Sequence, residues 1–139
     1  MTNPNPFSNA ERDQLRTYFG YPKLFKSSNA VFENVLDAIN GLYDSDGGAT
    51  QAACRNVMTQ IVALEAQLQV LQSLMLASEV TERIKVDAIK NDMYIRTISG
   101  PALINQLRIR FSMRPAIDYF ARVQMSEAGD NAGRIDISQ

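Results

Sequence analysis

The chain lacks histidine and tryptophan and has a single cysteine, Cys54, among its 139 residues. Without histidine, Ser-His-Asp and Cys-His couples are excluded, and the commonest general base at neutral pH is missing. One cysteine forms no internal disulfide, and without histidine it leaves no ligand set for structural zinc. Gly-rich phosphate-binding loops of the two common spacings are also absent. We therefore expect a protein that is not an enzyme and that binds no metal or cofactor.

An excess of charge of one sign and long apolar runs are missing as well. The 14 basic and 15 acidic residues give a formal net charge of −1, which argues against a protein that coats nucleic acid. The longest apolar runs, such as Leu74–Ala77, are far shorter than the ~20 residues of a membrane span. The N-terminus has neither the basic start nor the apolar stretch of a signal peptide. We expect one folded domain that is made inside a cell and has no membrane segment.

The chain does contain helical periodicity, which predicts a mainly α-helical protein built as a small bundle around one long central helix. We divide it into an extended N-terminal arm at 1–7, a helical domain at 8–125 and a flexible C-terminal tail at 126–139. Ser8 and Glu11 fit a capping box that starts a helix over 9–19. Gly20 suits the left-handed residue that ends this helix.

A second helix is expected to begin at Ser28 or Asn29, because both are good N-cap residues. Its apolar residues recur at the spacing of one buried helical face: Phe32, Val35, Leu36, Ile39, Leu42 and Tyr43. The helix is expected to end at the segment 44–48, DSDGG, which is similar to the start of a calcium-binding loop. Because Arg55 stands where such a loop needs a glutamate, we interpret the segment as a plain turn.

The segment 50–77 contains neither glycine nor proline and predicts the longest helix of the chain. Its apolar residues follow a sustained 4-3-4-3-4 spacing: Val57, Ile61, Leu64, Leu68, Leu71 and Met75. Other apolar residues lie off this seam, mostly in the C-terminal half. They favour burial beneath the neighbouring helices, and packing against another subunit is the alternative.

The segment 80–98 has two interpretations. Ile84, Val86 and Ala88 alternate with charged residues, as in one strand of a short β-hairpin. A continued amphipathic helix accounts for the same residues, because good helix formers stand among them. The sequence leaves both interpretations open.

Prolines set the limits of the last predicted helix. Pro101 follows Ser99 and Gly100 and suits the first position of a helix. Apolar residues then occupy one face: Leu103, Ile104, Leu107 and Phe111. Pro115 is expected to kink or divide this helix before a second apolar group that ends at Val123.

Charge is segregated along the chain. Residues 101–125 contain Arg108, Arg110, Arg114 and Arg122 against one acidic residue, a local net charge of +3. One interpretation is a solvated helix face that complements acidic neighbours. The other is contact with an acidic partner, or with DNA that passes through a channel, because guanidinium groups suit carboxylates and phosphates. We take Arg108, Arg110 and Arg114 as candidate partner contacts.

Three stretches resemble a known family: 11–22 (ERDQLRTYFGYP), 86–94 (VDAIKNDMY) and 100–108 (GPALINQLR). Together they resemble small neck proteins of tailed phages, especially of cyanobacterial phages, which are head–tail connectors or adaptors beneath the portal. The similarity covers about residues 10–120. It implies a structural virion protein of the neck that is assembled in the host cytoplasm. It also implies a ring of about a dozen copies, whose partners are other copies, the portal and the next neck or tail protein.

The polar tail ends in Arg134-Ile-Asp-Ile-Ser138, whose two isoleucines share one face of an extended strand. Such a segment suits addition to the sheet edge of a partner, so Ile135 and Ile137 are further candidate partner contacts. In a connector, the tail would reach a neighbouring subunit or the portal. The alternative function is a small cytoplasmic helical module or assembly chaperone that binds a partner helix in an exposed groove.

Overall fold

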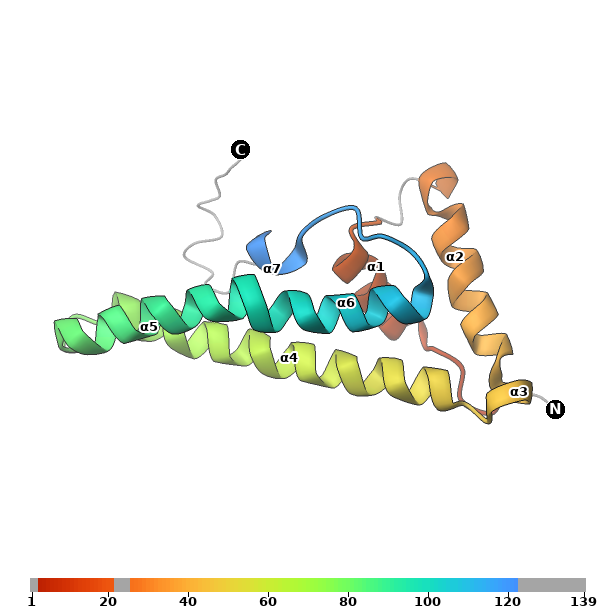
Figure 1. Cartoon of the computed structure of the whole chain (residues 1–139), viewed down its shortest axis with the longest axis horizontal. Helices are drawn as coiled ribbons and strands as arrows, with labels where there is room; N and C mark the ends of the chain where they lie inside the picture. The colour runs from red at the N-terminus through yellow and green to blue at the C-terminus, as the bar shows by residue number, and fades with distance from the viewer. Residues whose placement is uncertain (1–2, 22–25, 123–139) are drawn as a thin grey trace.

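A computed structural model describes residues 3–21 and 26–122, and every regular element within those ranges is helical. The elements are α1 (Asn9–Phe19), α2 (Lys26–Gly41), α3 (Tyr43–Asp46), α4 (Ala49–Leu76), α5 (Glu82–Tyr94), the π-helical turn η1 (Ile95–Ser99), α6 (Gly100–Phe111) and α7 (Tyr119–Arg122). The prediction of a mainly α-helical bundle around one long helix is confirmed (Figure 1). Among the described helices, none has both the length and the apolar character of a membrane-spanning segment.

The longest helix, α4, is uninterrupted, as its lack of glycine and proline predicts. At ~1.5 Å per residue it is about 42 Å long. α5, η1 and α6 run back along it in the opposite direction as one continuous helical segment (Figure 1). The segment 82–99 is therefore helical, and this observation decides between the two interpretations that the sequence left open.

The π-helical turn η1 joins α5 to α6 without a break. α6 begins at Gly100, so Pro101 is its second residue and not its first as expected, and Ser99 and Gly100 both keep the right-handed helical backbone angles of a continuing helix. Gly100 donates its N–H to the carbonyl of Ile95, five residues earlier. Proline has no N–H and its ring collides with the carbonyl four residues before it, so a wider turn accommodates Pro101 inside a continuing helix.

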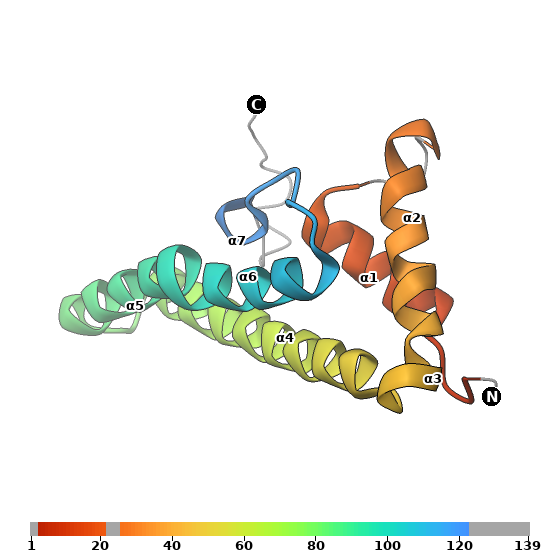
Figure 2. The ribbon, with the colours of Figure 1, turned by 45° about the vertical axis from the view of Figure 1, so that its right-hand side comes forward.

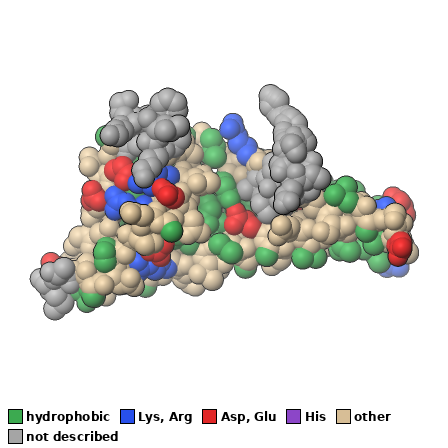
Figure 3. Space-filling model, turned by 180° about the vertical axis from the view of Figure 1, so that it is seen from behind, with side chains coloured by type: hydrophobic (Ala, Val, Ile, Leu, Met, Phe, Trp, Pro, Cys, Tyr) green, Lys and Arg blue, Asp and Glu red, His purple; other side chains and the backbone are tan. Residues whose placement is uncertain are grey.

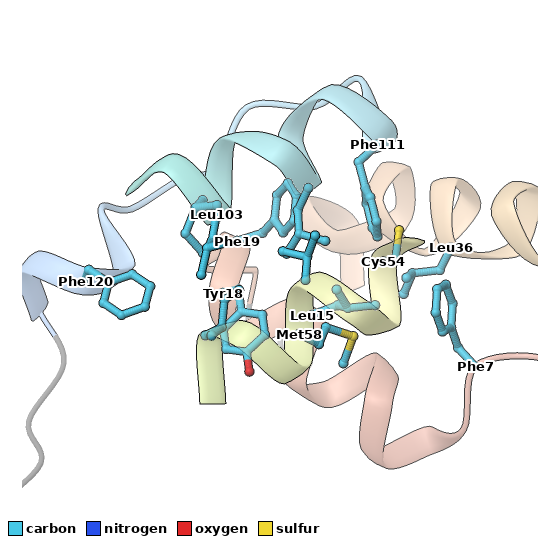
Figure 4. Close-up of a cluster of buried hydrophobic side chains, with 14 of the residues drawn as sticks. Phe7, Leu15, Tyr18, Phe19, Leu36, Cys54, Met58, Leu103, Phe111 and Phe120 are labelled. Carbon is cyan, nitrogen blue, oxygen red and sulfur yellow. The ribbon is translucent and has the colours of Figure 1, made fainter. Parts of the chain in front are cut away.

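The hydrophobic core lies where α1, α2 and α6 pack around the N-terminal half of α4 (Figure 2). Its centre is aromatic, because the rings of Phe19, Phe32 and Phe111 have centroids 5.0 to 5.5 Å apart. Phe7, Leu36 and Cys54 close one side of the cluster (Figure 4). The large side chains that are fully buried are Leu15, Phe19, Phe32, Leu36, Cys54, Ile61, Leu68, Leu107 and Phe120.

α1 begins and ends as predicted. The Ser8 hydroxyl accepts the Glu11 N–H at 3.1 Å, and the Glu11 carboxylate accepts the Ser8 N–H at 2.9 Å. Gly20 has a left-handed φ of 79°. The Tyr21 N–H then donates to the Arg16 carbonyl at 3.0 Å, which satisfies a carbonyl of the last turn.

α2 begins at Lys26, two residues before the earliest predicted N-cap, so that boundary prediction was wrong. Ser28 and Asn29 stand in the first turn instead. The N–H groups of a first turn have no partner within the helix, so residue types that favour caps are tolerated there.

The segment 44–48 is only partly the plain turn that we expected: residues 44–46 belong to the short helix α3, and Gly47 and Gly48 form the turn. Its Asp46 carboxylate accepts the N–H groups of Gly48 at 2.8 Å and Thr50 at 3.1 Å. A hydrogen bond from the Thr50 hydroxyl at 2.7 Å, together with these backbone bonds, lowers the pKa of Asp46 below its ordinary value. The carboxylate thus caps the start of α4, where an anion also complements the helix dipole.

The segment after α6 returns to α1. α6 ends at Phe111 because Ser112 takes a left-handed conformation with a φ of 53°, so this region is divided as predicted, although ahead of Pro115. The Ala116 N–H donates to the Phe19 carbonyl at 2.7 Å. Ile117 packs directly on Gly20, where an added Cβ would lie 2.7 Å from the Ile117 Cγ1.

α7 then packs on the π-helical turn. Phe120 is fully buried against Gly100, and a Cβ added to Gly100 would lie only 2.3 Å from the Phe120 Cγ. The Arg96 guanidinium donates to the Phe120 carbonyl at 2.9 Å and to the Asp92 carboxylate at 2.8 Å. The last described helix is therefore fixed to η1 by a glycine, an aromatic ring and an arginine.

The described part of the N-terminal arm, residues 3–7, is not helical and packs on its own chain. Phe7 is buried in the core, with the Arg55 guanidinium 5.3 Å from its ring centroid. Gln51, which is 3% exposed, donates to the Asn5 carbonyl at 3.1 Å and to the Asn40 side chain at 2.9 Å. These contacts hold the segment against the start of α4.

Candidate assembly surface

The buried titratable groups of the described residues have structural roles. Burial raises the pKa of the Cys54 thiol to about 11, so the thiol stays protonated and inert. Burial and the nearby Glu65 carboxylate raise the pKa of Tyr18 to about 12. The Tyr119 hydroxyl donates a hydrogen bond to Glu65 and so connects α7 to α4. Residues 3–21 and 26–122 contain no group of three or more metal-ligating side chains.

α4 carries only two charged residues, and both have partners within the chain. Arg55 forms an ion pair with Glu11 at 2.7 Å, and Glu65 accepts the hydrogen bond from Tyr119. No charged residue then occurs between 66 and 78, although several side chains of this stretch are exposed. A surface without charge is typical of the centre of a protein interface and unusual for a solvated helix face.

Exposed apolar side chains gather on the same part of the molecule. Here α4 and α5 extend beyond α1, α2 and α7, and we call residues 66–98 the helical arm (Figures 1 and 2). Of the twelve large apolar side chains exposed in the described residues, eight lie on this arm: Val70, Leu76, Ile84, Val86, Ile89, Met93, Tyr94 and Ile98. In Figure 3 the arm is largely green and tan, with charged side chains gathered at its end.

A groove of about 510 Å³ runs between α4 and the α5–η1 segment on one side of the helical arm. Its walls are mainly apolar, and they include Leu64, Ala66, Val70, Leu71, Tyr94 and Ile95. On α5 the small side chain of Ala88 is buried, with 2% of its surface exposed, where α5 packs on α4. We refer to this groove as the arm groove.

The other side of the arm carries an apolar stripe of Val86, Ile89 and Met93, which are 41%, 47% and 59% exposed. With 3.6 residues per turn, each residue turns the helix by about 100°. When the rotation about the helix axis is measured from Ala88, which faces α4, the stripe lies on one flank of α5 and Tyr94 lies on the other. We call the stripe the arm ridge.

The structure separates the three candidate arginines. Arg108 and Arg114 line one groove of about 420 Å³ between α6 and the segment that returns to α1. Arg110 lies on the other flank of α6, where its charge acts on the Cys54 thiol. None of the three forms an ion pair with another described residue, and Arg108 donates to Asn105 at 2.8 Å.

The tail candidates Ile135 and Ile137 lie outside the described residues, as does Val123. α7 ends at Arg122, beside η1. The described chain thus ends on a helix that packs on η1, and Ile95 and Ser99 of η1 also form part of the arm-groove wall.

Sequence reasoning missed the arm groove and the arm ridge. The signal was present, because the alternation of Ile84, Val86 and Ala88 that favoured a strand places apolar residues on both flanks of a helix. No protein-family model, curated protein or solved structure matches the chain significantly. The chain's own surface therefore carries the functional argument.

Proposed function

We propose that the protein is a structural subunit of the neck of a tailed phage, a head–tail adaptor or connector. In this role about a dozen copies form a ring beneath the portal and link the capsid to the tail. The observation that carries the proposal is the helical arm, where an uncharged stretch of α4 coincides with eight exposed large apolar side chains. A chain that works alone in solution gains nothing from such a surface, whereas a ring subunit buries it against its neighbours.

The polar contacts of the described residues favour a structural role. The ion pairs around α1 and α2 connect helices of one chain, because Arg12 and Arg16 both bind Glu33. Glu65, Tyr119 and Arg55 hold elements together in the same way. The described polar side chains thus stabilise one rigid shape, which suits a subunit that must present fixed surfaces.

Arg108 and Arg114 are the candidate contact with the portal in this proposal. They share a groove, are exposed and have no acidic partner among the described residues. An acidic surface would pair with both guanidinium groups, and a DNA backbone in the channel offers the same chemistry. Replacing both residues by Gln should weaken portal binding and reduce its salt dependence, whereas Arg110→Gln on the other flank should change neither.

The test is co-expression with the portal protein of the same phage, followed by electron microscopy and mass measurement of the purified particles. We expect annular particles in which this chain forms a ring on the portal. A stable monomer that does not bind the portal would contradict the proposal.

The arm groove favours a second candidate function, a small helical module or assembly chaperone. Its volume of about 510 Å³ and its apolar walls suit one face of a partner helix. In that case the purified protein stays monomeric or dimeric and binds one partner helix at a 1:1 ratio. The measurement of particle mass separates the two candidates.

A further inference from the structure

The helical arm has an apolar ridge on one flank and an apolar groove on the other. We propose that the arm ridge of one copy packs into the arm groove of the next copy, so that subunits associate head to tail. The inference deepens the proposed ring-forming role and rests on it. It names the surfaces that meet, which the proposed function leaves open.

The two flanks of the arm have complementary shapes. The ridge presents Val86, Ile89 and Met93 at helical spacing, and the groove offers a mainly apolar hollow lined by Val70 and Tyr94. One row of side chains on a helix fits between two helices of a partner in this way. A two-fold pair would place ridge on ridge or groove on groove, and each copy would keep one apolar flank exposed to water.

The charged residues beside the ridge and the groove are complementary as well. On the ridge flank of α5 stand Glu82 and Lys85, and on the groove flank stand Arg83 and Asp87, as the rotation of about 100° per residue places them. When two arms lie parallel, Glu82 of one copy comes level with Arg83 of the next. Lys85 likewise comes close to the level of Asp87. None of these four residues forms an ion pair within the described part of its own chain.

The α4 wall of the groove is uncharged. The stretch 66–78 of α4 contains no charged residue, so the arm of a neighbour can cover it without desolvating an ion. The four charged residues that flank the ridge and the groove then form a polar rim around an apolar centre, the usual composition of a protein interface.

Head-to-tail contact has a consequence for the size of the assembly. Each copy offers one ridge and one groove on opposite flanks, so every added copy leaves one of each free at the ends. Growth then stops only when the chain of subunits closes into a ring. The geometry of the arm therefore favours a cyclic assembly over a dimer.

The experiment uses two variants of the full-length chain that each damage one surface. Ile89→Asp places a carboxylate on the ridge and Val70→Asp places one in the groove. Each variant alone should associate about 100-fold more weakly than the parent, because a charge replaces a central apolar contact. Mixing the two should give a 1:1 heterodimer, since one intact groove and one intact ridge remain, and the mixture should grow no further.

The control substitutions have the same chemistry away from the arm. Val31 on α2 is 61% exposed, the same fraction as Val70, and Ile109 on α6 is 58% exposed. Val31→Asp and Ile109→Asp should assemble like the parent. Circular dichroism of all four variants checks that they fold, and sedimentation velocity and native mass spectrometry measure the assemblies.

The outcomes separate this inference from the proposed function. If the Ile89→Asp and Val70→Asp variants still form rings on the portal as the parent does, the ridge-and-groove contact is overturned and the neck role stands. Two other results would overturn it as well: a two-fold dimer of either variant alone, or a monomeric parent whose groove binds a foreign helix. A parent that stays monomeric with and without portal would overturn both proposals.

Discussion

The contact between Gly100 and Phe120 gives the most direct test of how the chain after α6 is held. Gly100 has helical backbone angles (φ −64°, ψ −53°), so alanine is sterically allowed by its own backbone. Alanine in a helix interior is favoured over glycine by ~0.8–1 kcal/mol. Considered locally, Gly100→Ala should therefore stabilise the protein.

The packing around Gly100 instead predicts that Gly100→Ala lowers the stability of the protein. An added Cβ would lie 2.3 Å from Cγ and 2.5 Å from Cδ2 of Phe120, well inside van der Waals contact, and the fully buried ring has to leave its site. Loss of a buried phenylalanine costs ~3–5 kcal/mol. After subtraction of the helix-propensity gain of ~1 kcal/mol, Gly100→Ala should lower the free energy of unfolding by ~2–4 kcal/mol.

Urea denaturation followed by circular dichroism measures this change, at a concentration where the protein is monomeric. Gly41→Ala is the matched control, because Gly41 ends α2 and has nothing within 4 Å of an added Cβ. That variant should be unchanged or slightly more stable. In a Phe120→Ala background the clash is gone, so Gly100→Ala should become stabilising by up to ~1 kcal/mol. The reasoning is refuted if Gly100→Ala is as stable as the parent, or if its cost is the same without the Phe120 ring.

Three further changes test other parts of the structure. Leu68 is fully buried, so Leu68→Asp should lower the free energy of unfolding by ~3 kcal/mol or more in the same assay. Val62→Asp is the control, because Val62 is exposed on the same helix, and it should have little effect on stability. The hydrogen bond from Arg55 lowers the pKa of Glu11 below its ordinary 4.5. The pair therefore stabilises the fold fully above pH 4.5, and its contribution to the free energy of unfolding is lost as the pH falls through the lowered pKa. Acid denaturation should therefore show a weaker pH dependence for Glu11→Gln than for the parent. Deletion of 127–139 should leave the melting temperature within about a degree or two of that of the parent and should abolish portal binding in a pull-down. Loss of the folded structure on deletion would show instead that the tail belongs to the domain.

Local signals in the sequence predicted the elements that depend on a few neighbouring residues. Ser8 and Glu11 cap α1, and Gly20 ends it, because the hydrogen bonds involved span only three to five residues. The absence of glycine and proline from 50–77 similarly predicted α4 nearly to its ends. These features need no knowledge of the rest of the chain.

Other features depend on contacts between distant residues and could not be predicted. Nothing near Gly100 indicates that Phe120 packs on it, and nothing near Phe7 indicates that its ring enters the core. The candidate arginines were taken as one group because they are close in sequence. A helix nevertheless places Arg108 and Arg110 about 200° apart around its axis, so only Arg108 and Arg114 share a groove.

The π-helical turn also limits where the chain can change in length. Buried side chains occur on α5 and η1 at Ala88 and Ile95, and on α6 at Leu103, Leu107 and Phe111. A π-helical turn contains more residues than an α-helical turn, so η1 sets how the buried face of α5 is rotated against that of α6. Deletion of a single residue from 95–99 would rotate one half of this helix against the other by about 100°. A change of length in 95–99 would therefore alter both the buried face of α6 and the direction of the helical arm, a constraint that the non-helical connection at 77–80 does not share.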